Sequence, residues 1–195
     1  MAIEIHTVAC LQDNFCFLIH NGETGQTALI DVSEAAPIQA VLDAKGWDLT
    51  DVLLTHHHWD HIDELPALRE RYKPRVIGAA ADAHRLPPLD LEVGDGDHFT
   101  TCGIDTRVLD VSGHTIGHIA FYMPQIKAAF TADSLMALGC GRLTEGTPEM
   151  MWPSLMKLRA LPDDTAIYSA HEYSAGNGAF AITLEPDNAA LISRI

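Results

Sequence analysis

The sequence predicts an α+β protein in which two β-sheets pack face to face and helices cover their outer surfaces. Strand-like runs fall into two groups, one before residue 80 and the other between about residues 97 and 131. Helix-like segments lie among them, and glycines or polar turns separate neighbouring strands. Each group of strands is expected to form one sheet. Because a sheet has to bury an apolar face, the two sheets are expected to face each other, with the helices outside. The 195 residues are enough for one domain, with or without a small appendage.

The first half of the chain is expected to open with an antiparallel meander, because two short polar turns separate its first three strands. A helix then follows a cap at Ser33 or Glu34 and stops at Gly46, and a second helix covers 63–72. Strands are predicted at 3–9, 15–20, 27–31, 51–54 and 75–78.

The second half is expected to supply the other sheet. Thr147 and Pro148 are typical of a helix start, and Asp187 is predicted to cap a last helix. Helical segments are predicted within 79–90, from 148 to about 161, and over 188–195. Strands are predicted at 97–100, 104–111, 119–123, 128–131 and 166–170.

Composition excludes several classes of protein. The formal net charge is -15 and no cluster of Lys and Arg occurs, which argues against a nucleic-acid partner. No apolar run approaches the roughly 18 residues of a membrane span, and the N-terminus lacks the features of a secretory signal. The four cysteines form no C-x-x-C pair, so reduced thiols of a cytoplasmic protein are expected at Cys10, Cys16, Cys102 and Cys140.

Four histidines and an aspartate crowd into residues 55–61, whose sequence is Thr-His-His-His-Trp-Asp-His. This segment follows a short apolar run and precedes a predicted helix. Imidazole and carboxylate groups are the ligand types that suit zinc and similar divalent ions. Because alternate side chains of an extended segment point the same way, His56, His58 and Asp60 are expected to share a face, whereas His57 points elsewhere.

Three further polar segments follow predicted strands. They are 112–118 (Ser-Gly-His-Thr-Ile-Gly-His), 131–134 (Thr-Ala-Asp-Ser) and 169–173 (Ser-Ala-His-Glu-Tyr). Functional sites gather at the carboxyl ends of strands, where loops converge. The sequence therefore favours a common site built from these segments and the histidine cluster.

Taken together, T-H-x-H-x-D-H, G-H-T-x-G-H, an Asp after a strand and a late His resemble the motifs of the metallo-β-lactamase superfamily. Residues 139–142 (Gly-Cys-Gly-Arg), 145–150 (Glu-Gly-Thr-Pro-Glu-Met) and 171–173 (His-Glu-Tyr) are similar to the glyoxalase II family, the hydroxyacylglutathione hydrolases. The resemblance covers nearly the whole chain, from residue 13 to residue 190. It implies a four-layer αββα sandwich.

That resemblance also implies two divalent metal ions, with zinc expected and iron or manganese accepted by the same donors. The first ion takes His56, His58 and His114, the second takes Asp60, His61 and His171, and Asp133 bridges both. The implied catalytic groups are Asp60, Asp133 and a bridging hydroxide that acts as the nucleophile.

The implied reaction is hydrolysis of a glutathione thioester of the S-D-lactoylglutathione type to glutathione and a 2-hydroxy acid such as D-lactate, as in methylglyoxal detoxification. By resemblance, Arg142 and Tyr173 contact the glutathione portion, since a guanidinium binds a carboxylate bidentately. The family often has an aromatic residue after the basic one, and this chain has Leu143 and Thr144 there.

Alternative functions share parts of this pattern. They are a mononuclear iron persulfide dioxygenase, a β-lactamase, and a non-catalytic metal- or glutathione-binding domain. Members of the glyoxalase II family usually continue into a helical region. We therefore expect residues 1–180 to form the catalytic domain and residues 181–195 to begin a C-terminal helical region that is cut short.

Three residues near the motifs are open to more than one interpretation. His118 either supports the site from behind the ligands or merely begins a strand. Asp31 either orients a ligand or is an ordinary turn carboxylate. Trp59 is expected to pack beside the metals rather than to form a platform for the substrate.

Overall fold

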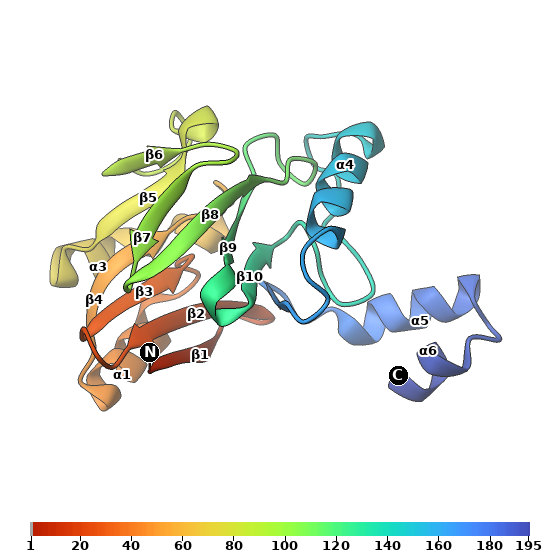
Figure 1. Cartoon of the computed structure of the whole chain (residues 1–195), viewed down its shortest axis with the longest axis horizontal. Coiled ribbons are helices and arrows are strands. Elements are labelled where there is room, and N and C mark those ends of the chain that lie inside the picture. The colour runs from red at the N-terminus through yellow and green to blue at the C-terminus, as the bar shows by residue number, and fades with distance from the viewer. Residues whose placement is uncertain (1) are drawn as a thin grey trace.

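A computed structural model describes residues 2–195 and places the strands in two sheets with helices at the periphery (Figure 1). The first sheet has the order β1-β2-β3-β4-β5-β6. Its first three strands pair antiparallel, and the remaining pairs are parallel, so the predicted opening meander is confirmed. The strands are β1 (Ile3–Cys10), β2 (Asn14–Asn21), β3 (Gln26–Ile30), β4 (Asp48–Leu53), β5 (Arg75–Ala79) and β6 (Leu91–Val93).

The second sheet has the order β11-β10-β9-β8-β7. Its neighbours are antiparallel except for β10 and β11, which run parallel and therefore end at the same edge. The strands are β7 (His98–Thr101), β8 (Ile104–Asp110), β9 (Ile119–Met123), β10 (Ala128–Ala132) and β11 (Ala166–Ser169). This confirms the predicted α+β architecture of two sheets.

Six α-helices of the described chain occupy the periphery of the sheets. Figure 1 shows α1 and α3 beside the first sheet, where they also contact each other, and α4 beside the loops of the second. The helices are α1 (Ala35–Lys45), α2 (Trp59–Ile62), α3 (Leu65–Tyr72), α4 (Pro148–Arg159), α5 (Ser174–Leu184) and α6 (Ala189–Arg194). Two short 3₁₀ segments are η1 (Ala80–Asp82) and η2 (Pro124–Ile126).

The core lies where the inner faces of the two sheets meet. Ile19 and Ile30 of the first sheet and Phe121 and Phe130 of the second are buried members of one apolar cluster. The rings of Phe17 and Phe130 pack across the sheets at 5.8 Å. Each Å² of apolar surface buried here contributes about 25 cal/mol to stability. This core gives the loops at the strand ends a rigid base.

Two features of the C-terminal region correct the predictions. Helix α5 was not predicted, and it forms although Gly176 and Gly178 are poor helix formers. Asn188, not Asp187, caps α6, because its side-chain oxygen accepts a hydrogen bond from the Leu191 amide at 3.1 Å. The division of the chain after residue 180 stays a prediction.

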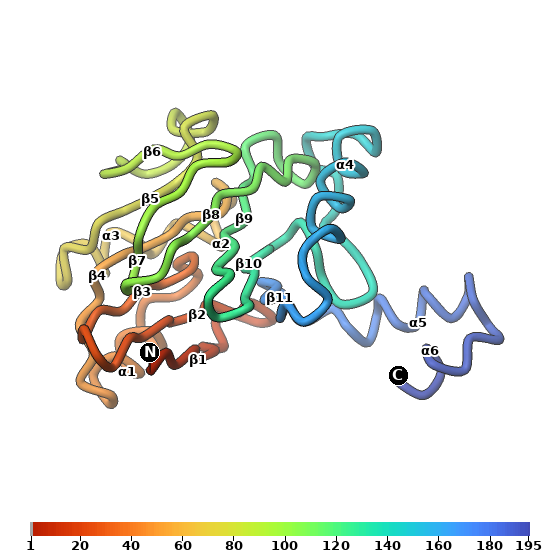
Figure 2. Tube along the Cα trace, viewed as in Figure 1, coloured from red at the N-terminus to blue at the C-terminus, as the bar shows by residue number. Residues whose placement is uncertain are grey.

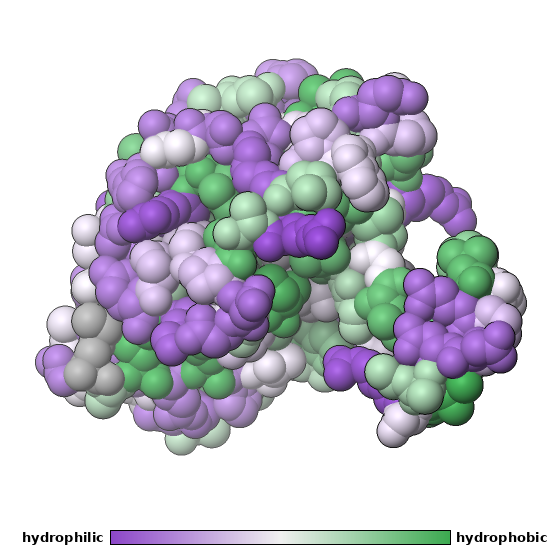
Figure 3. Space-filling model, turned by 45° about the vertical axis from the view of Figure 1, so that its right-hand side comes forward, coloured by the Kyte–Doolittle hydropathy of each residue, from purple (hydrophilic) through white to green (hydrophobic). Residues whose placement is uncertain are grey.

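Helices α5 and α6 form a helical arm, residues 174–194, that projects from the sheets (Figure 1). Figure 3 shows hydrophobic side chains on this arm and a hollow between it and the rest of the molecule. Phe180, Leu184 and Ile192 are each more than half exposed. Among residues 2–195, no helix is long and apolar enough to cross a membrane.

Candidate metal centre

The four polar segments singled out in the sequence converge at the carboxyl ends of strands. The loop after β4 carries His56 and His58, and the loop after β8 carries His114. Asp133 directly follows β10, and His171 lies two residues after the end of β11. Strand ends that meet at one edge explain why residues more than a hundred positions apart come together.

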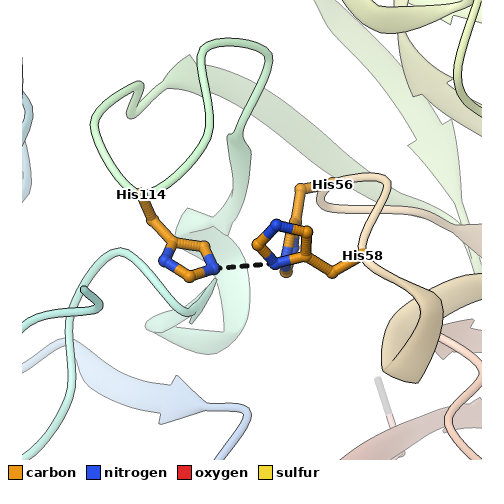
Figure 4. Close-up of side chains that lie close together, drawn as sticks. All are labelled: His56, His58 and His114. Atoms are coloured by element: carbon orange, nitrogen blue, oxygen red, sulfur yellow. Dashed lines mark hydrogen bonds between the residues drawn. The ribbon is translucent and has the colours of Figure 1, made fainter. Parts of the chain in front are cut away.

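Three imidazoles, those of His56, His58 and His114, form the first of two candidate ligand sets. One nitrogen from each lies within 4.8 Å of the others. Nδ1 of His58 is 3.0 Å from Nε2 of His114, and Figure 4 shows the three rings approaching one another from the two loops. This set matches the predicted first metal site.

Asp60, His61 and His171 form the second ligand set, whose donor atoms also lie within 4.8 Å of one another. Oδ2 of Asp60 is 3.6 Å from Nε2 of His61 and 3.5 Å from Nε2 of His171. The expectation that Asp60 shares an extended face with His56 and His58 is wrong. The chain turns into α2 at Trp59, and this helical turn carries Asp60 to the second set.

Asp133 lies between the two sets. Its Oδ2 atom is 3.3 Å from Nε2 of His114, whereas Oδ1 is 3.3 Å from Nε2 of His171 and 3.6 Å from Nε2 of His61. Ala132 has a φ of 43°, in the left-handed region that L-residues rarely adopt, and this backbone bend precedes the carboxylate. One side chain thus presents one oxygen to each set.

Three buried polar atoms at the centre fit a bound cation. Nε2 of His56, Nε2 of His61 and Oδ1 of Asp133 have no hydrogen-bond partner among the described residues. Buried polar atoms are nearly always paired, so a shared ligand is the economical explanation. Imidazole nitrogen and carboxylate oxygen are donors that divalent ions accept. The clusters therefore fit a dinuclear metal site.

Each buried ligand imidazole is oriented through its other nitrogen. Nδ1 of His56 is 3.0 Å from Oγ1 of Thr55, and Nδ1 of His114 is 2.6 Å from the carbonyl oxygen of Arg142. Nδ1 of His61 is 2.8 Å from Oδ2 of Asp31. Such partners fix the tautomer and aim the ligand nitrogen at the metal position. This contact favours the interpretation of Asp31 as an orienting residue over that of an ordinary turn carboxylate.

Asp13 and Asn14, which sequence reasoning assigned only to a turn, also contact ligands. Oδ1 of Asp13 is 2.9 Å from Nδ1 of His171, and the amide of Asn14 donates to Oδ2 of Asp60 at 3.0 Å. The Asp-Asn-Phe segment carries no metal-ligand spacing that would have revealed these contacts. Only the fold brings the turn to the site.

Two other histidines lie beside the ligands without joining either set. The buried ring of His118 stacks on His56 at 4.6 Å, which favours its support of the site from behind. His57 points away, as predicted. Its Nδ1 atom is 2.9 Å from Oδ2 of Asp82, and its Nε2 atom is 3.4 Å from Oε1 of Glu145.

The two ligand sets differ in electrostatics. Burial holds the pKa of His56 well below its usual value and also lowers the pKa of His58, with help from His114. Burial opposes protonation of His171 as well, but Asp133, Asp13 and Asp60 outweigh it and raise its pKa to about 9. His56 and His58 are thus neutral at pH 7, whereas without metal His171 holds a proton.

Asp133 remains ionised at the centre. Burial works to raise the pKa of its carboxyl, but the neighbouring imidazoles, His171 first among them, outweigh burial and hold that pKa well below its usual range. A carboxylate that stays charged over the whole physiological pH range is suited to contact two cations.

A cleft of about 650 Å³ opens onto the ligands. His58, His114 and Asp133 line it, together with the exposed Arg142 and with Tyr173. The ring of Tyr173 stacks on His171 at 5.0 Å. The predicted substrate residues therefore border the same cleft as the predicted ligands.

Trp59 corrects a prediction at the edge of this cleft. It was expected to pack beside the metals, but it is 65% exposed and lines the opening. The helical turn α2 turns its side chain outward, although the neighbouring His61 is buried.

Comparison with known families and curated proteins gives concordant results. The Metallo-beta-lactamase superfamily matches residues 12–171. A hydroxyacylglutathione hydrolase of Ruegeria pomeroyi is 65% identical over 194 residues, which are 100% of this chain and 76% of that protein. Another, from Jannaschia sp., is 60% identical over 192 residues, which are 98% of this chain and 75% of that protein. The chain spans about three quarters of the length of these relatives.

Solved structures share the fold. ETHE1 from Myxococcus xanthus has a TM-score of 0.77 and 31% identity over 89% of this chain and 76% of its own. The BLEG-1 B3 metallo-beta-lactamase has a TM-score of 0.80 over 87% of this chain and 92% of its own, at 20% identity. At that low identity the likeness concerns the fold alone.

Proposed function

Because this chain belongs to the metallo-β-lactamase superfamily and, within it, to the hydroxyacylglutathione hydrolases, we propose that the two ligand sets and the cleft carry out thioester hydrolysis at a pair of divalent ions. The protein is a thioester hydrolase that acts on glutathione thioesters. The proposed acyl group is a 2-hydroxy acid such as D-lactate. The observation that carries the proposal is the carboxylate of Asp133, whose two oxygens face different ligand sets.

In this proposal, each ion has three ligands of its own and one shared carboxylate. His56, His58 and His114 would hold the first ion, Asp60, His61 and His171 would hold the second, and Asp133 would offer one oxygen to each. When bound, such a pair of ions makes a nucleophile available from water at neutral pH and stabilises negative charge on the thioester oxygen. We propose zinc, supported by the imidazole and carboxylate donors, although iron and manganese accept the same set.

The substrate-binding role falls to residues of the cleft outside the ligand sets. The guanidinium of Arg142 is exposed at the cleft, which suits bidentate pairing with a carboxylate of the glutathione peptide. Tyr173 packs its ring on His171 and offers a phenol to the peptide portion. A thiol with a pKa near about 8.5 leaves readily as thiolate at neutral pH, so the leaving group needs no strong general acid.

The experiment that tests this function pairs turnover with metal content. The protein is expected to release free thiol from S-D-lactoylglutathione and to hold two divalent ions per chain by elemental analysis. Asp133→Ala should lose the paired ions and at least about 100-fold in kcat together. Asp163→Ala, at an exposed aspartate, is the matched control and should match the wild type in both. Two retained ions with full turnover in Asp133→Ala would overturn the assignment.

Other functions on the same fold have distinct readouts. Oxygen uptake with glutathione persulfide would indicate a mononuclear iron dioxygenase, and nitrocefin hydrolysis would indicate a β-lactamase. Metal binding without thioester turnover would indicate a binding domain. The grouping of Asp60, His61 and His171 beside the first set favours hydrolysis, because a mononuclear enzyme has no need of these three donors.

We also propose a cytoplasmic setting and a small-molecule substrate as the only partner of the site. The four cysteines are free thiols, which is typical of reducing compartments. Residues 1–180 are proposed to contain the whole catalytic unit, because all seven proposed metal ligands lie within that range.

A further inference from the structure

We propose that Asp13 and Asn14 are positioning residues that hold the second ligand set and thereby set the occupancy of the second metal position without affecting the first. This inference rests on the proposed dinuclear function. The two residues lie at the turn between β1 and β2, where each contacts a different ligand of the second set.

The side chains of the turn meet two ligands that come from distant parts of the chain. Oδ1 of Asp13 lies 2.9 Å from Nδ1 of His171, 158 positions away. The buried Asn14 donates its amide to Oδ2 of Asp60 at 3.0 Å, 46 positions away. The same Oδ2 atom faces Nε2 of His171 at 3.5 Å. Asn14 therefore holds the oxygen of Asp60 that faces the second metal position.

Backbone hydrogen bonds lock the turn to the segment that carries His171. Asn14 and His171 form an isolated antiparallel bridge. The Phe15 amide donates to the carbonyl of Ala170 at 2.6 Å, and the Glu172 amide donates to the carbonyl of Asp13 at 3.0 Å. Figure 2 shows this end of the N-terminal hairpin beside the chain that follows β11. The turn thus ties the first sheet to the end of the second sheet at the site.

The first ligand set makes none of these contacts. His56 is oriented by Thr55 and His114 by the carbonyl of Arg142, both neutral oxygen partners outside the turn. A carboxylate partner such as Asp13 raises the basicity of the ligand imidazole and fixes its ring orientation. Loss of the turn contacts should therefore weaken one metal position selectively.

The contacts also predict that removal of either side chain affects the second set alone. Without Asn14, no described amide fixes Oδ2 of Asp60, whose other neighbours are the ligand imidazoles at 3.5 and 3.6 Å. Without Asp13, Nδ1 of His171 loses its only side-chain acceptor among the described residues. Removal of such orienting partners typically reduces metal affinity by about 10–100-fold.

The test measures metal stoichiometry in the purified full chain. After dialysis against a weak chelator, Asp13→Ala and Asn14→Ala are expected to retain about one zinc ion per chain where the wild type retains two. Gln12→Ala is the matched control, because Gln12 lies exposed in the same turn, and it should retain two. Excess zinc should restore kcat in the variants with little change in KM, which a general loss of structure would not allow.

Conservative variants at the same two positions change the functional group but keep the size of the side chain. Asp13→Asn preserves an acceptor for His171 and should recover part of the zinc affinity. Asn14→Asp replaces the amide donor by a second carboxylate beside Asp60, so the variant should retain less zinc at the second position than the wild type. Two tightly held ions in all these variants overturn the proposal, as does equal loss of both ions. Absence of thioester turnover in the wild type would overturn the proposed function instead, and the stoichiometry would still decide the role of the turn.

Discussion

The carboxylate of Asp31 approaches the Nδ1 atom of His61 to 2.8 Å and at the same time accepts two hydrogen bonds from Thr55. Asp31 is 2% exposed and has a φ of 55°, a conformation that few L-residues other than Asn and Asp adopt readily. Thr55 in turn contacts His56 at 3.0 Å. One buried carboxylate therefore supports a ligand of each set, directly for His61 and through Thr55 for His56.

Replacing Asp31 should consequently affect both metal positions. Asp31→Ala leaves the Thr55 amide and Nδ1 of His61 without their acceptor, at a cost of about 3 kcal/mol or more in the free energy of unfolding. Metal content should fall toward zero, in contrast to the loss of one ion expected at Asp13. Denaturant unfolding and elemental analysis measure the two effects.

Asp31→Asn is the informative companion variant. Asn tolerates the left-handed backbone and retains one acceptor oxygen, so a smaller loss of stability and of metal is expected. Full metal content in Asp31→Ala would contradict the shared support of the two sets.

A closed ring of four charged or titratable side chains ties the loops around the site together. His57 contacts Asp82, Asp82 contacts Arg85, Arg85 contacts Glu145, and Glu145 returns to His57. Glu145 also accepts a hydrogen bond from the amide of Ile116 at 2.9 Å, in the loop that carries a metal ligand. The Arg85 guanidinium lowers the pKa of the Glu145 carboxyl to about 2 despite partial burial.

Arg85→Ala should therefore destabilise the protein and loosen the cleft. Asp82 is fully buried, and its loss of a cationic partner should cost about 2–3 kcal/mol. Because the folded pKa of Glu145 is depressed, its stabilisation is present above pH 4.5 and is lost as the pH falls toward about 2. Unfolding curves between pH 2 and pH 6 should show this loss in the wild type and a weaker one in Arg85→Ala.

The exposed Arg159 supplies the control for that experiment. Arg159→Ala should leave both the stability and its acid dependence within about 0.5 kcal/mol of the wild type. An acid profile of Arg85→Ala that coincides with the wild type would exclude the ring as a source of the pH dependence.

Binding of metal to the metal-free protein should release protons near pH 7. The pKa of His171 is raised to about 9 by Asp133, Asp13 and Asp60 against the effect of burial, so its imidazole is protonated without metal, whereas a ligand must be neutral. Calorimetry in buffers of different ionisation enthalpy should detect a net release of at least about one proton, to which His171 contributes. Zinc affinity should rise from pH 6.5 to about 9 and then level.

The same shift has the opposite effect on the metal-free fold. Because the folded pKa of His171 is raised, its stabilisation of the fold is fully present below the unfolded pKa of 6.5. That stabilisation is lost as the pH rises through about 9. Between pH 6.5 and about pH 9, the metal-free protein should lose roughly 3 kcal/mol of its free energy of unfolding. A zinc affinity that does not change across that range would contradict the assignment of a protonated His171.

The grouping of the candidate metal ligands at one edge was predictable because their residue types and short spacings are visible in short stretches of the sequence. His56 and His58 lie two apart after a strand, and His114 and His171 follow other strands, so strand ends alone were enough to group them. The bridging role of Asp133 agrees with the resemblance, and its distances to both sets are consistent with it.

What the sequence could not predict depends on long-range packing. Asp13 contacts a ligand 158 positions away, and no local pattern distinguishes it from an ordinary turn residue. Helix α5 forms despite Gly176 and Gly178, which lower its helical propensity. The outward position of Trp59 depends on a single helical turn in α2, whereas the sequence suggested an extended segment.

Gly141 provides the strictest steric test of the centre. A Cβ atom there would lie 2.1 Å from the carbonyl oxygen of Asp133, closer than non-bonded atoms approach, and 3.0 Å from Nδ1 of His114, a tight contact. The Gly141 amide also donates to that carbonyl at 2.8 Å. Gly141→Ala must therefore displace the segment that precedes Arg142, or the bridging carboxylate itself. Since a misplacement of about 1 Å can cost about 100-fold in rate, kcat/KM for the thioester should fall by that order.

Gly176→Ala separates this steric effect from a general effect of the added methyl group. Nothing lies within 4 Å of a Cβ atom at Gly176, which sits in α5, where alanine is favoured over glycine by about 1 kcal/mol. This variant should match the wild type in turnover and metal content and equal or exceed it in stability. If Gly141→Ala also keeps two ions and full kcat/KM, the segment at 139–142 can move without disturbing Asp133, and the close backbone contact is not what fixes the bridge.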